Sequence, residues 1–340
     1  MPSLPKTYKA AIFEQPNSSL KVIDVELKHP GPGQVLVKVL TCGVCHSDAM
    51  VQNGALGSQF PRVPGHEIIG DIVELGEGVS NWVIGDRVGG GWHGGHDGTC
   101  KQCRRGLYQM CSNGTVNGVY IDGGYAEYVL LRTEAVVRVP KDADPAEYAP
   151  LLCAGLTVFN SMRRLNIGAG ELVAIQGLGG LGHLAVQYAN KMGFKVVALS
   201  NGSSKAEFAK KLGAHEYIDT SKEDGPAKLA ALGGAAMIVS TAPNPAVIPP
   251  LLNGLQAGGH LLLLAPVGPV EIDTVTLLQK AASVSSFPCG HAWDAEDTIE
   301  FTKLHEIKCL IEKFPLADAQ KAFEHTLGGH VRFRSVLVME

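Results

Sequence analysis

The chain has 340 residues, of which 45% are hydrophobic, and this length and composition predict two folded domains rather than disorder. Its 29 basic and 33 acidic residues give a formal net charge of −4 and are scattered along the sequence, so we expect small-molecule partners rather than nucleic acid or a membrane. Met1–Ala10 lacks the apolar core of a signal peptide, and the longest apolar run, Leu261–Val267, is too short to span a bilayer, which predicts a cytoplasmic protein.

The segment from Gln34 to Val88 predicts an all-β, barrel-like module. Short runs of branched apolar residues alternate there with glycines that we interpret as turns. The predicted strands are Val35–Val39, Ile68–Ile69, Asp71–Leu75 and Trp82–Ile84, and the predicted turn glycines are Gly70, Gly76, Gly78 and Gly85.

Two thiolates and an imidazole are dispersed through the first half of the chain, as Cys45, His66 and Cys153. Each alone is weak evidence, since a lone cysteine or histidine more often belongs to the core. Together they form a ligand set that leaves the fourth position of a zinc ion open for water or substrate. Their co-occurrence therefore predicts a catalytic zinc site.

Residues 91–114 contain many glycines and few branched apolar residues, which predicts a loop organised by a metal ion rather than by a core. Cys100, Cys103 and Cys111 have spacings that let one loop wrap around a tetrahedral ion, and Asp97 precedes them as a fourth ligand. His93 and His96 are rivals to Asp97 for that position. We expect a closed, structural zinc site and cysteines that are reduced rather than paired in disulfides.

After about Ala154 the pattern changes to alternating strands and helices, which predicts a parallel, doubly wound sheet. After Ser286 the alternation ends, and a strand at Val331–Val338 returns to the first module. We therefore expect a discontinuous catalytic domain, 1–152 and 290–340, around a nucleotide-binding domain, 153–289. The predicted strands are Leu172–Ile175, Lys195–Leu199, one near Tyr217, Met237–Ser240 and Leu261–Ala265, and the predicted helices are Leu181–Met192 and Ser204–Leu212.

A glycine-rich loop follows the first of these strands and opens the first helix. Its G-x-G-x-x-G pattern allows a tight turn, close approach of the backbone to a pyrophosphate, and close packing of helix on strand. The alternative is a glycine-rich helix entry in an unrelated α/β protein, but the flanking elements favour dinucleotide binding. The predicted contacts of the loop are Gly177, Gly179, Gly180, Leu181 and Gly182.

The second strand of this domain ends without the carboxylate that usually binds the ribose of NAD. Ser200, Asn201, Ser204 and Lys205 offer neutral or positive groups there, which favours NADP because a carboxylate would repel the 2′-phosphate. NAD remains possible, since no arginine is present and a serine-rich helix start is often only a cap.

These motifs together resemble the zinc-containing medium-chain alcohol dehydrogenases, in the same order and over nearly the whole chain. The likeness is strongest to the microbial and fungal tetrameric members, and the chain's ending is similar to the cinnamyl-alcohol branch, which tends to use NADP. The segments that carry it, besides the cysteine and dinucleotide loops, are Gly43–Asp48, Gly65–Glu67, Gly85–Val88, Ala154–Thr157 and Val331–Arg334.

The resemblance implies an α/β protein: a chaperonin-10-like barrel that binds two zinc ions per chain, plus a Rossmann domain, assembled as a homotetramer or a homodimer. It implies an oxidoreductase that interconverts a small, primary alcohol and its aldehyde. Glu67 would lie near the catalytic zinc and Asp48 would orient His66. Ser47 would pass the alcohol proton to the cofactor ribose, Trp92 would line the substrate pocket, and His46 would lie near the pyrophosphate.

Two departures from the family pattern stand out. Asp97 occupies the place of the usual first cysteine, so its zinc is expected to be held less tightly. Met50 occupies the place of the histidine that ends the proton relay, which leaves the relay beyond Ser47 and the ribose open. Two other functions stay open: a zinc-free quinone or enone reductase, and a non-catalytic dinucleotide-binding redox sensor.

Overall fold

The computed structural model describes residues 4–339 of the chain, so the first three residues of the segment Met1–Ala10 lie outside it. The chain divides into two compact units. The first comprises the chain up to Leu156, Cys289–Leu304 and the segment from Lys308 onward, and the second comprises Thr157–Pro288 and His305–Ile307. Cys153 therefore belongs to the first unit.

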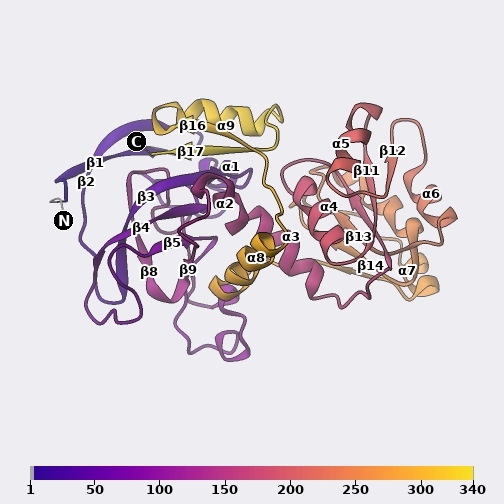
Figure 1. Cartoon of the computed structure of the whole chain (residues 1–340), viewed down its shortest axis with the longest axis horizontal. Coiled ribbons are helices and arrows are strands. Elements are labelled where there is room, and N and C mark those ends of the chain that lie inside the picture. Colours follow the sequence, from indigo (N-terminus) through magenta and orange to yellow (C-terminus); the bar gives the residue numbers. More distant parts are fainter. Residues whose placement is uncertain (1–3, 340) are drawn as a thin grey trace. The chain divides into compact units, whose positions relative to one another are not determined.

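The first unit is built on a seven-stranded sheet in which the C-terminal strand β17 pairs antiparallel with β3 (Figure 1). Its core consists of the inward side chains of these strands, and includes Val35, Val37 and Ile68. The strands of the sheet are β3 (Gln34–Val44), β4 (Ile68–Leu75), β5 (Arg87–Gly90), β8 (Tyr128–Arg132), β9 (Val136–Arg138), β16 (Ile311–Pro315) and β17 (Arg334–Val338).

Shorter elements complete the first unit. They are β1 (Thr7–Ile12), β2 (Lys21–Glu26), α1 (Asp48–Gln52), β6 (His93–Gly95), β7 (Thr115–Val116), α2 (Pro145–Tyr148), α8 (Ala292–Leu304) and α9 (Ala319–Leu327). Helix α3 (Ala154–Arg163) begins in the first unit and continues in the second.

Two predictions for the barrel are wrong. Trp82–Ile84 is a loop: Trp82 is buried against the guanidinium of Arg138, while Val83 is 61% exposed. Gly70 is not a turn but lies within β4, where the predicted strands Ile68–Ile69 and Asp71–Leu75 join. A Cβ at Gly70 would overlap the carbonyl oxygen of Lys38 on β3, so this glycine serves close strand pairing.

The second unit contains a six-stranded, all-parallel sheet in the order β12-β11-β10-β13-β14-β15, which confirms the predicted doubly wound topology. Strand β10 is buried throughout, as expected for a sheet with both faces covered. The strands are β10 (Leu172–Gln176), β11 (Lys195–Ser200), β12 (Glu216–Asp219), β13 (Ala235–Ser240), β14 (Leu255–Leu263) and β15 (Ser283–Ser285).

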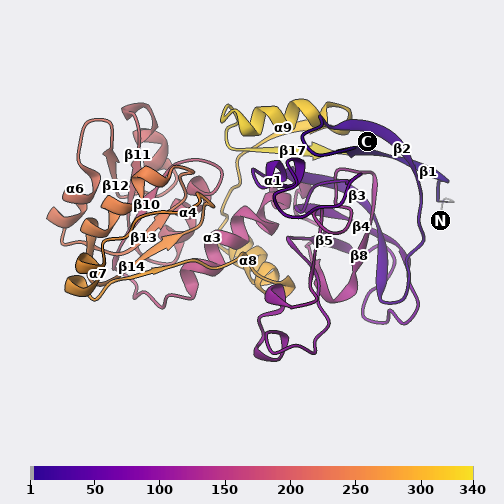
Figure 2. The same ribbon diagram turned by 180° about the vertical axis from the view of Figure 1, so that it is seen from behind.

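Helices accompany this sheet, as Figure 2 shows from behind. They are α4 (Gly182–Lys191), α5 (Ala206–Lys211), α6 (Gly225–Ala231) and α7 (Thr274–Lys280). The predicted strand Leu261–Ala265 instead begins at Leu255 and ends at Leu263. Leu255 pairs with Ala235 of β13, and the pairing resumes at His260 after a register shift at the segment that contains Gly258 and Gly259.

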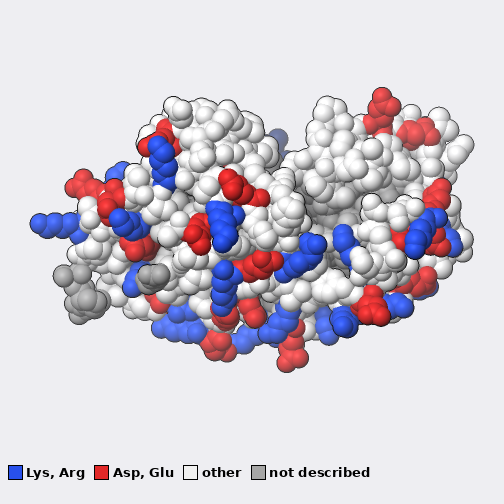
Figure 3. Space-filling model, turned by 90° about the horizontal axis from the view of Figure 1, so that it is seen from above, with Lys and Arg blue, Asp and Glu red and all other residues white. Residues whose placement is uncertain are grey.

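Charged side chains of both signs are interspersed on the face shown in Figure 3, in keeping with the small net charge. Within residues 4–339, no helix combines the length and apolar content that crossing a membrane requires.

Candidate active site

Four predicted ligands converge inside the first unit although they come from different parts of the chain. Cys45 follows β3, His66 and Glu67 precede β4, and Cys153 precedes α3. Their ligand atoms all lie within 4.8 Å of one another. His66 and Glu67 are fully buried.

The spacing of the two sulfurs fits a zinc ion. Two thiolates about 2.3 Å from one tetrahedral ion lie about 3.8 Å apart, and the Sγ atoms of Cys45 and Cys153 are 3.8 Å apart. Hydrogen bonding with Cys153 and with His66 holds the pKa of Cys45 well below its usual value despite burial, so this sulfur is readily available as a thiolate.

Ser47 and Asp48 contact this group of ligands from the start of α1. The Ser47 hydroxyl donates to Cys45 Sγ at 3.1 Å and lies 3.4 Å from His66 Nε2. On the other side of the ring, His66 Nδ1 lies 3.4 Å from Oδ1 of the buried Asp48. The imidazole is thus placed with Nε2 toward the thiols and Nδ1 toward a carboxylate, the orientation that a metal ligand requires.

Arg334 is a part of this site that the sequence reasoning missed. It begins β17, is buried, and donates to Glu67 Oε1 across 267 positions of sequence. Burial raises the pKa of Glu67 to about 7, against the opposing charge of Arg334. The second carboxylate oxygen of Glu67, Oε2, is buried without a hydrogen-bond partner within the described chain. This oxygen is therefore available to bind a cation.

Cys289 is the second residue that the sequence did not single out. This buried thiol precedes α8, and its Sγ lies 3.8 Å from the carbonyl oxygen of Cys153. The only signal in the sequence was its residue type, because no ligand spacing relates it to the other cysteines.

The second group of predicted ligands also comes together. The ligand atoms of Asp97, Cys100, Cys103 and Cys111 lie within 4.8 Å of one another. Cys100 Sγ is 3.5 Å from Cys103 Sγ and 3.9 Å from Cys111 Sγ, close to the spacing of about 3.8 Å for thiolates on one tetrahedral ion. No disulfide joins any of the eight cysteines, all of which lie within residues 4–339.

The structure separates the two rival histidines from this group. His93 is buried in β6, and its Nε2 lies 3.1 Å from Nδ1 of His96, so each ring faces the other. Asp97 Oδ1 instead lies 3.6 Å from Cys111 Sγ. Asp97 is thus the residue that the fold brings to the thiols.

The glycine-rich loop of the second unit joins β10 to α4 as predicted. Gly177 has φ +98°, and a Cβ at Gly182 would overlap the Gly177 carbonyl oxygen, whereas the space beside Gly179 is open. Gly180 and Leu181 complete the turn into α4. The loop therefore has the tight turn and the open backbone face that a pyrophosphate needs.

At the end of β11, Ser200 is buried and its Oγ accepts from Lys205 Nζ at 3.4 Å, while Asn201 and Ser204 are exposed. A carboxylate is nonetheless close, since Asp219 on β12 is paired in register with Ser200. Its Oδ1 accepts from the Gly202 amide at 2.9 Å. Sequence reasoning along one strand missed it.

The remaining predicted residues lie around the first group of ligands. The Trp92 ring stands edge-on to His66, with 4.8 Å between ring centroids. His46 is exposed, and Met50 lies in α1.

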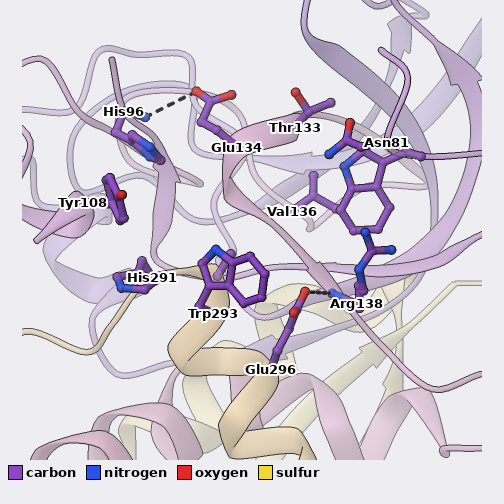
Figure 4. Close-up of a pocket in the computed structure, with 12 residues that line it drawn as sticks. Asn81, His96, Tyr108, Thr133, Glu134, Val136, Arg138, His291, Trp293 and Glu296 are labelled. Atoms are coloured by element: carbon purple, nitrogen blue, oxygen red, sulfur yellow. Dashed lines mark hydrogen bonds between the residues drawn. The ribbon is translucent and has the colours of Figure 1, made fainter. Parts of the chain in front are cut away.

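A cavity of about 280 Å³ lies elsewhere in the first unit (Figure 4). His96, Tyr108, His291 and Trp293 line it, and Glu296 accepts from the Arg138 amide at 2.8 Å. No thiol of either group lines this cavity, and Trp92 does not either.

Residues 31–141 match the family described as alcohol dehydrogenase GroES-like domain, and residues 180–305 match the family described as zinc-binding dehydrogenase. The chain is 56% identical over 335 residues to alcohol dehydrogenase patD of Penicillium expansum, and the match covers 98% of each.

Two solved structures are similar throughout. Acetophenone reductase from Geotrichum candidum in complex with NAD has a TM-score of 0.87 and 26% identity, covering 99% of this chain and 98% of that one. CAD from Helicobacter pylori complexed with NADP(H) has a TM-score of 0.86 and 27% identity, covering 98% of each chain. The predicted fold class, a GroES-like barrel with a Rossmann domain, is confirmed.

Proposed function

The chain belongs to the zinc-binding alcohol dehydrogenases, and on that premise we propose that it interconverts a small, primary alcohol and its aldehyde with a nicotinamide cofactor. The observation that carries this proposal is the convergence of Cys45, His66 and Cys153, three donors of the right chemistry within bonding reach of one ion. Zinc bound there supplies Lewis acidity to the oxygen of an alcohol or a carbonyl.

We assign each residue of the site a role from its contacts. Cys45, His66 and Cys153 hold the zinc, and Glu67 lies close enough to approach it. Asp48 orients His66 from behind. The Ser47 hydroxyl, within reach of the same ligands, would accept the substrate proton and pass it on toward the cofactor ribose. Trp92, packed against His66, restricts the substrate pocket.

For the cofactor we propose that Gly177, Gly179, Gly180, Leu181 and Gly182 hold the pyrophosphate, with His46 nearby. We propose a preference for NADP over NAD from the neutral or positive side chains of Ser200, Asn201, Ser204 and Lys205. The nearby carboxylate of Asp219 does not oppose this preference, because one of its oxygens accepts from the Gly202 amide and the other faces Lys222. Asp97, Cys100, Cys103 and Cys111 hold a second, structural zinc ion.

The remaining assignments are also proposals. We place the catalytic domain at 1–152 and 290–340 and the nucleotide-binding domain at 153–289, although the first compact unit extends to Leu156 and so includes Cys153. We also propose a homotetramer, with a homodimer as the alternative. Two groups of free thiols suit a reducing compartment, which supports a cytoplasmic location.

Cys45→Ser tests the metal assignment. The hydroxyl is a poor zinc ligand compared with a thiolate, so we expect turnover to be abolished while cofactor binding, followed by fluorescence titration, stays nearly unchanged. Cys309→Ser is the matched control, since Cys309 is buried but lies outside both groups of ligands. Loss of turnover and of cofactor binding together would indicate misfolding rather than a lost ligand.

Initial rates with ethanol, benzyl alcohol, cinnamaldehyde and a ketone, each with NAD and NADP, would define the substrate class. The two other functions separate in the same assay. A zinc-free quinone or enone reductase is not favoured, because it would lack the ligands present here. A redox sensor would bind cofactor and turn over none of these compounds.

A further inference from the structure

A glycine-glycine-tyrosine segment, Gly123–Tyr125, runs beside the metal ligand His66 and takes no part in the assignments above. Its backbone pairs with the residues that precede His66: the Gly124 amide donates to the Gly65 carbonyl at 3.0 Å, and the Tyr125 amide donates to the Pro64 carbonyl at 3.1 Å. These two hydrogen bonds therefore fix the segment against the residues that precede His66.

Gly65 explains how the tyrosine ring fits there. Its φ is +100°, and a Cβ at this position would overlap Cδ1 of Tyr125. Glycine before His66 thus serves two needs, a left-handed backbone and space for an aromatic ring. Tyr125 is 0% exposed, so its hydroxyl depends on a partner inside the protein.

That partner is Asp48. The Tyr125 hydroxyl donates to Asp48 Oδ2 at 2.8 Å, and the amide of Cys45 donates to the same oxygen at 2.9 Å. Two donors on Oδ2 fix the rotation of the carboxylate and leave Oδ1 facing His66 Nδ1 at 3.4 Å. Asp48 has no access to water, since it is also 0% exposed, so these donors replace the hydration of Oδ2.

We propose that Tyr125 is a positioning residue of the catalytic metal site, acting through Asp48 on His66. The proposal rests on the proposed function, because it presumes that zinc binds at His66. In this proposal the contacts from Tyr125 to Asp48 and from Asp48 to His66 hold the imidazole in the tautomer and orientation that zinc needs. Tyr125 itself does not contact the substrate.

Tyr125→Phe removes one hydroxyl and keeps the ring that packs on Gly65. We expect the apparent dissociation constant of the catalytic zinc to rise about 10-fold, the lower end of the range for partners outside the ligand shell. This dissociation constant is measured by competition with a chelator. The catalytic zinc is identified as the ion that is present in the wild-type chain and absent from the Cys45→Ser variant. Cobalt substitution supplies a second readout, a shifted visible spectrum that a purely structural role would not produce.

Two comparisons make the result decisive. Tyr128→Phe is the matched control: Tyr128 is a partly buried tyrosine on β8 whose ring packs on Tyr8, and its loss should leave zinc affinity unchanged. In an Asp48→Ala background, which leaves the Tyr125 hydroxyl no side-chain acceptor at position 48, Tyr125→Phe should add no further loss, because its effect runs through that carboxylate.

Unchanged zinc affinity and an unchanged cobalt spectrum in Tyr125→Phe would overturn the proposal, as would full additivity with Asp48→Ala. If the wild-type chain instead bound no zinc that Cys45→Ser removes, the proposed function itself would fail, so the two failures are distinguishable.

Discussion

Ser200 ends strand β11 with its hydroxyl turned to the ammonium of Lys205, and the nearest carboxylate, Asp219, is engaged by Gly202 and Ser221. In the proposed cofactor site, the side chain at position 200 therefore determines whether a negative charge lies beside the adenosine ribose. Serine at this position would present donors to a 2′-phosphate bound there rather than a second negative charge.

Ser200→Asp should shift the cofactor preference toward NAD, since an added carboxylate accepts from ribose hydroxyls and repels a 2′-phosphate. We expect the ratio of kcat/KM with NAD to that with NADP to rise about 10-fold or more, equivalent to about 1.4 kcal/mol. Ser200→Ala, which adds no charge, is the control. An unchanged ratio in the aspartate variant would mean that this pocket is misplaced.

His93 is a second residue with a measurable consequence. Burial, together with the nearby His96, His291 and Arg132, lowers its pKa to about 3. In the unfolded chain its pKa is about 6.5, so the unfolded state takes up a proton below that pH while the folded state stays neutral down to about 3. His93 therefore makes stability fall as pH falls through this window.

Between pH 6.5 and 5.5 this contribution amounts to about 1 kcal/mol of unfolding free energy. His93→Asn should lose that part of the pH dependence, measured as the difference in urea midpoint between the two pH values. His29→Asn is the control, because His29 is exposed and pairs with Glu74 at the surface. Equal pH dependence in wild type and His93→Asn would contradict the assignment.

At the scale of elements, the segment from Asp97 to Cys111 contains only short turns and two 3₁₀ helices, so metal ligation would be its main source of order. Asp97 is exposed, and its carboxylate also accepts from the Thr99 amide at 2.8 Å and from Asn113 at 2.6 Å. Asp97 thus caps the loop, and in the proposed structural zinc site it would also be a hard ligand.

Asp97→Cys should give four soft ligands and slow zinc release, because thiolate binds zinc more strongly than an exposed carboxylate does. We expect release to a chelator to slow about 10-fold, and Asp97→Ala to accelerate it, as measured by a zinc-sensitive dye. Identical release from all three proteins would show that Asp97 is only a cap.

At the scale of the whole molecule, the second unit ends its sheet with the short edge strand β15, next to β14. Helix α7 exposes Val275 by 57% and Leu278 by 82%. Exposed apolar side chains near an unpaired sheet edge are typical of a subunit interface, which supports an assembly of several copies.

Leu278→Glu should therefore reduce the oligomer to a smaller species in size-exclusion chromatography with light scattering, since a carboxylate is costly in an apolar contact. Leu304→Glu is the matched control, because Leu304 is 76% exposed on α8 in the first unit. A monomeric wild type, or disruption by Leu304→Glu alone, would contradict this interface.

Local patterns were sufficient for much of this protein. The parallel sheet and the glycine loop follow from strand and helix periodicity, and Cys100, Cys103 and Cys111 follow from spacing within one loop. Cys45, His66 and Cys153 were predicted from the co-occurrence of two thiols and an imidazole along the chain, because the local sequence around any one of them does not show that they meet.

Only the tertiary structure decided the contacts between distant segments. Strand pairing brought Asp219 beside Ser200, the return of β17 brought Arg334 to Glu67, and the pairing of Gly123–Tyr125 with the chain before His66 brought a hydroxyl to Asp48. The apolar residues at Trp82–Ile84 also led to the wrong prediction of a strand where the structure has a loop. The physical reason is common to all four: periodicity reports which face of an element is buried, whereas the partner it is buried against depends on how the whole chain packs.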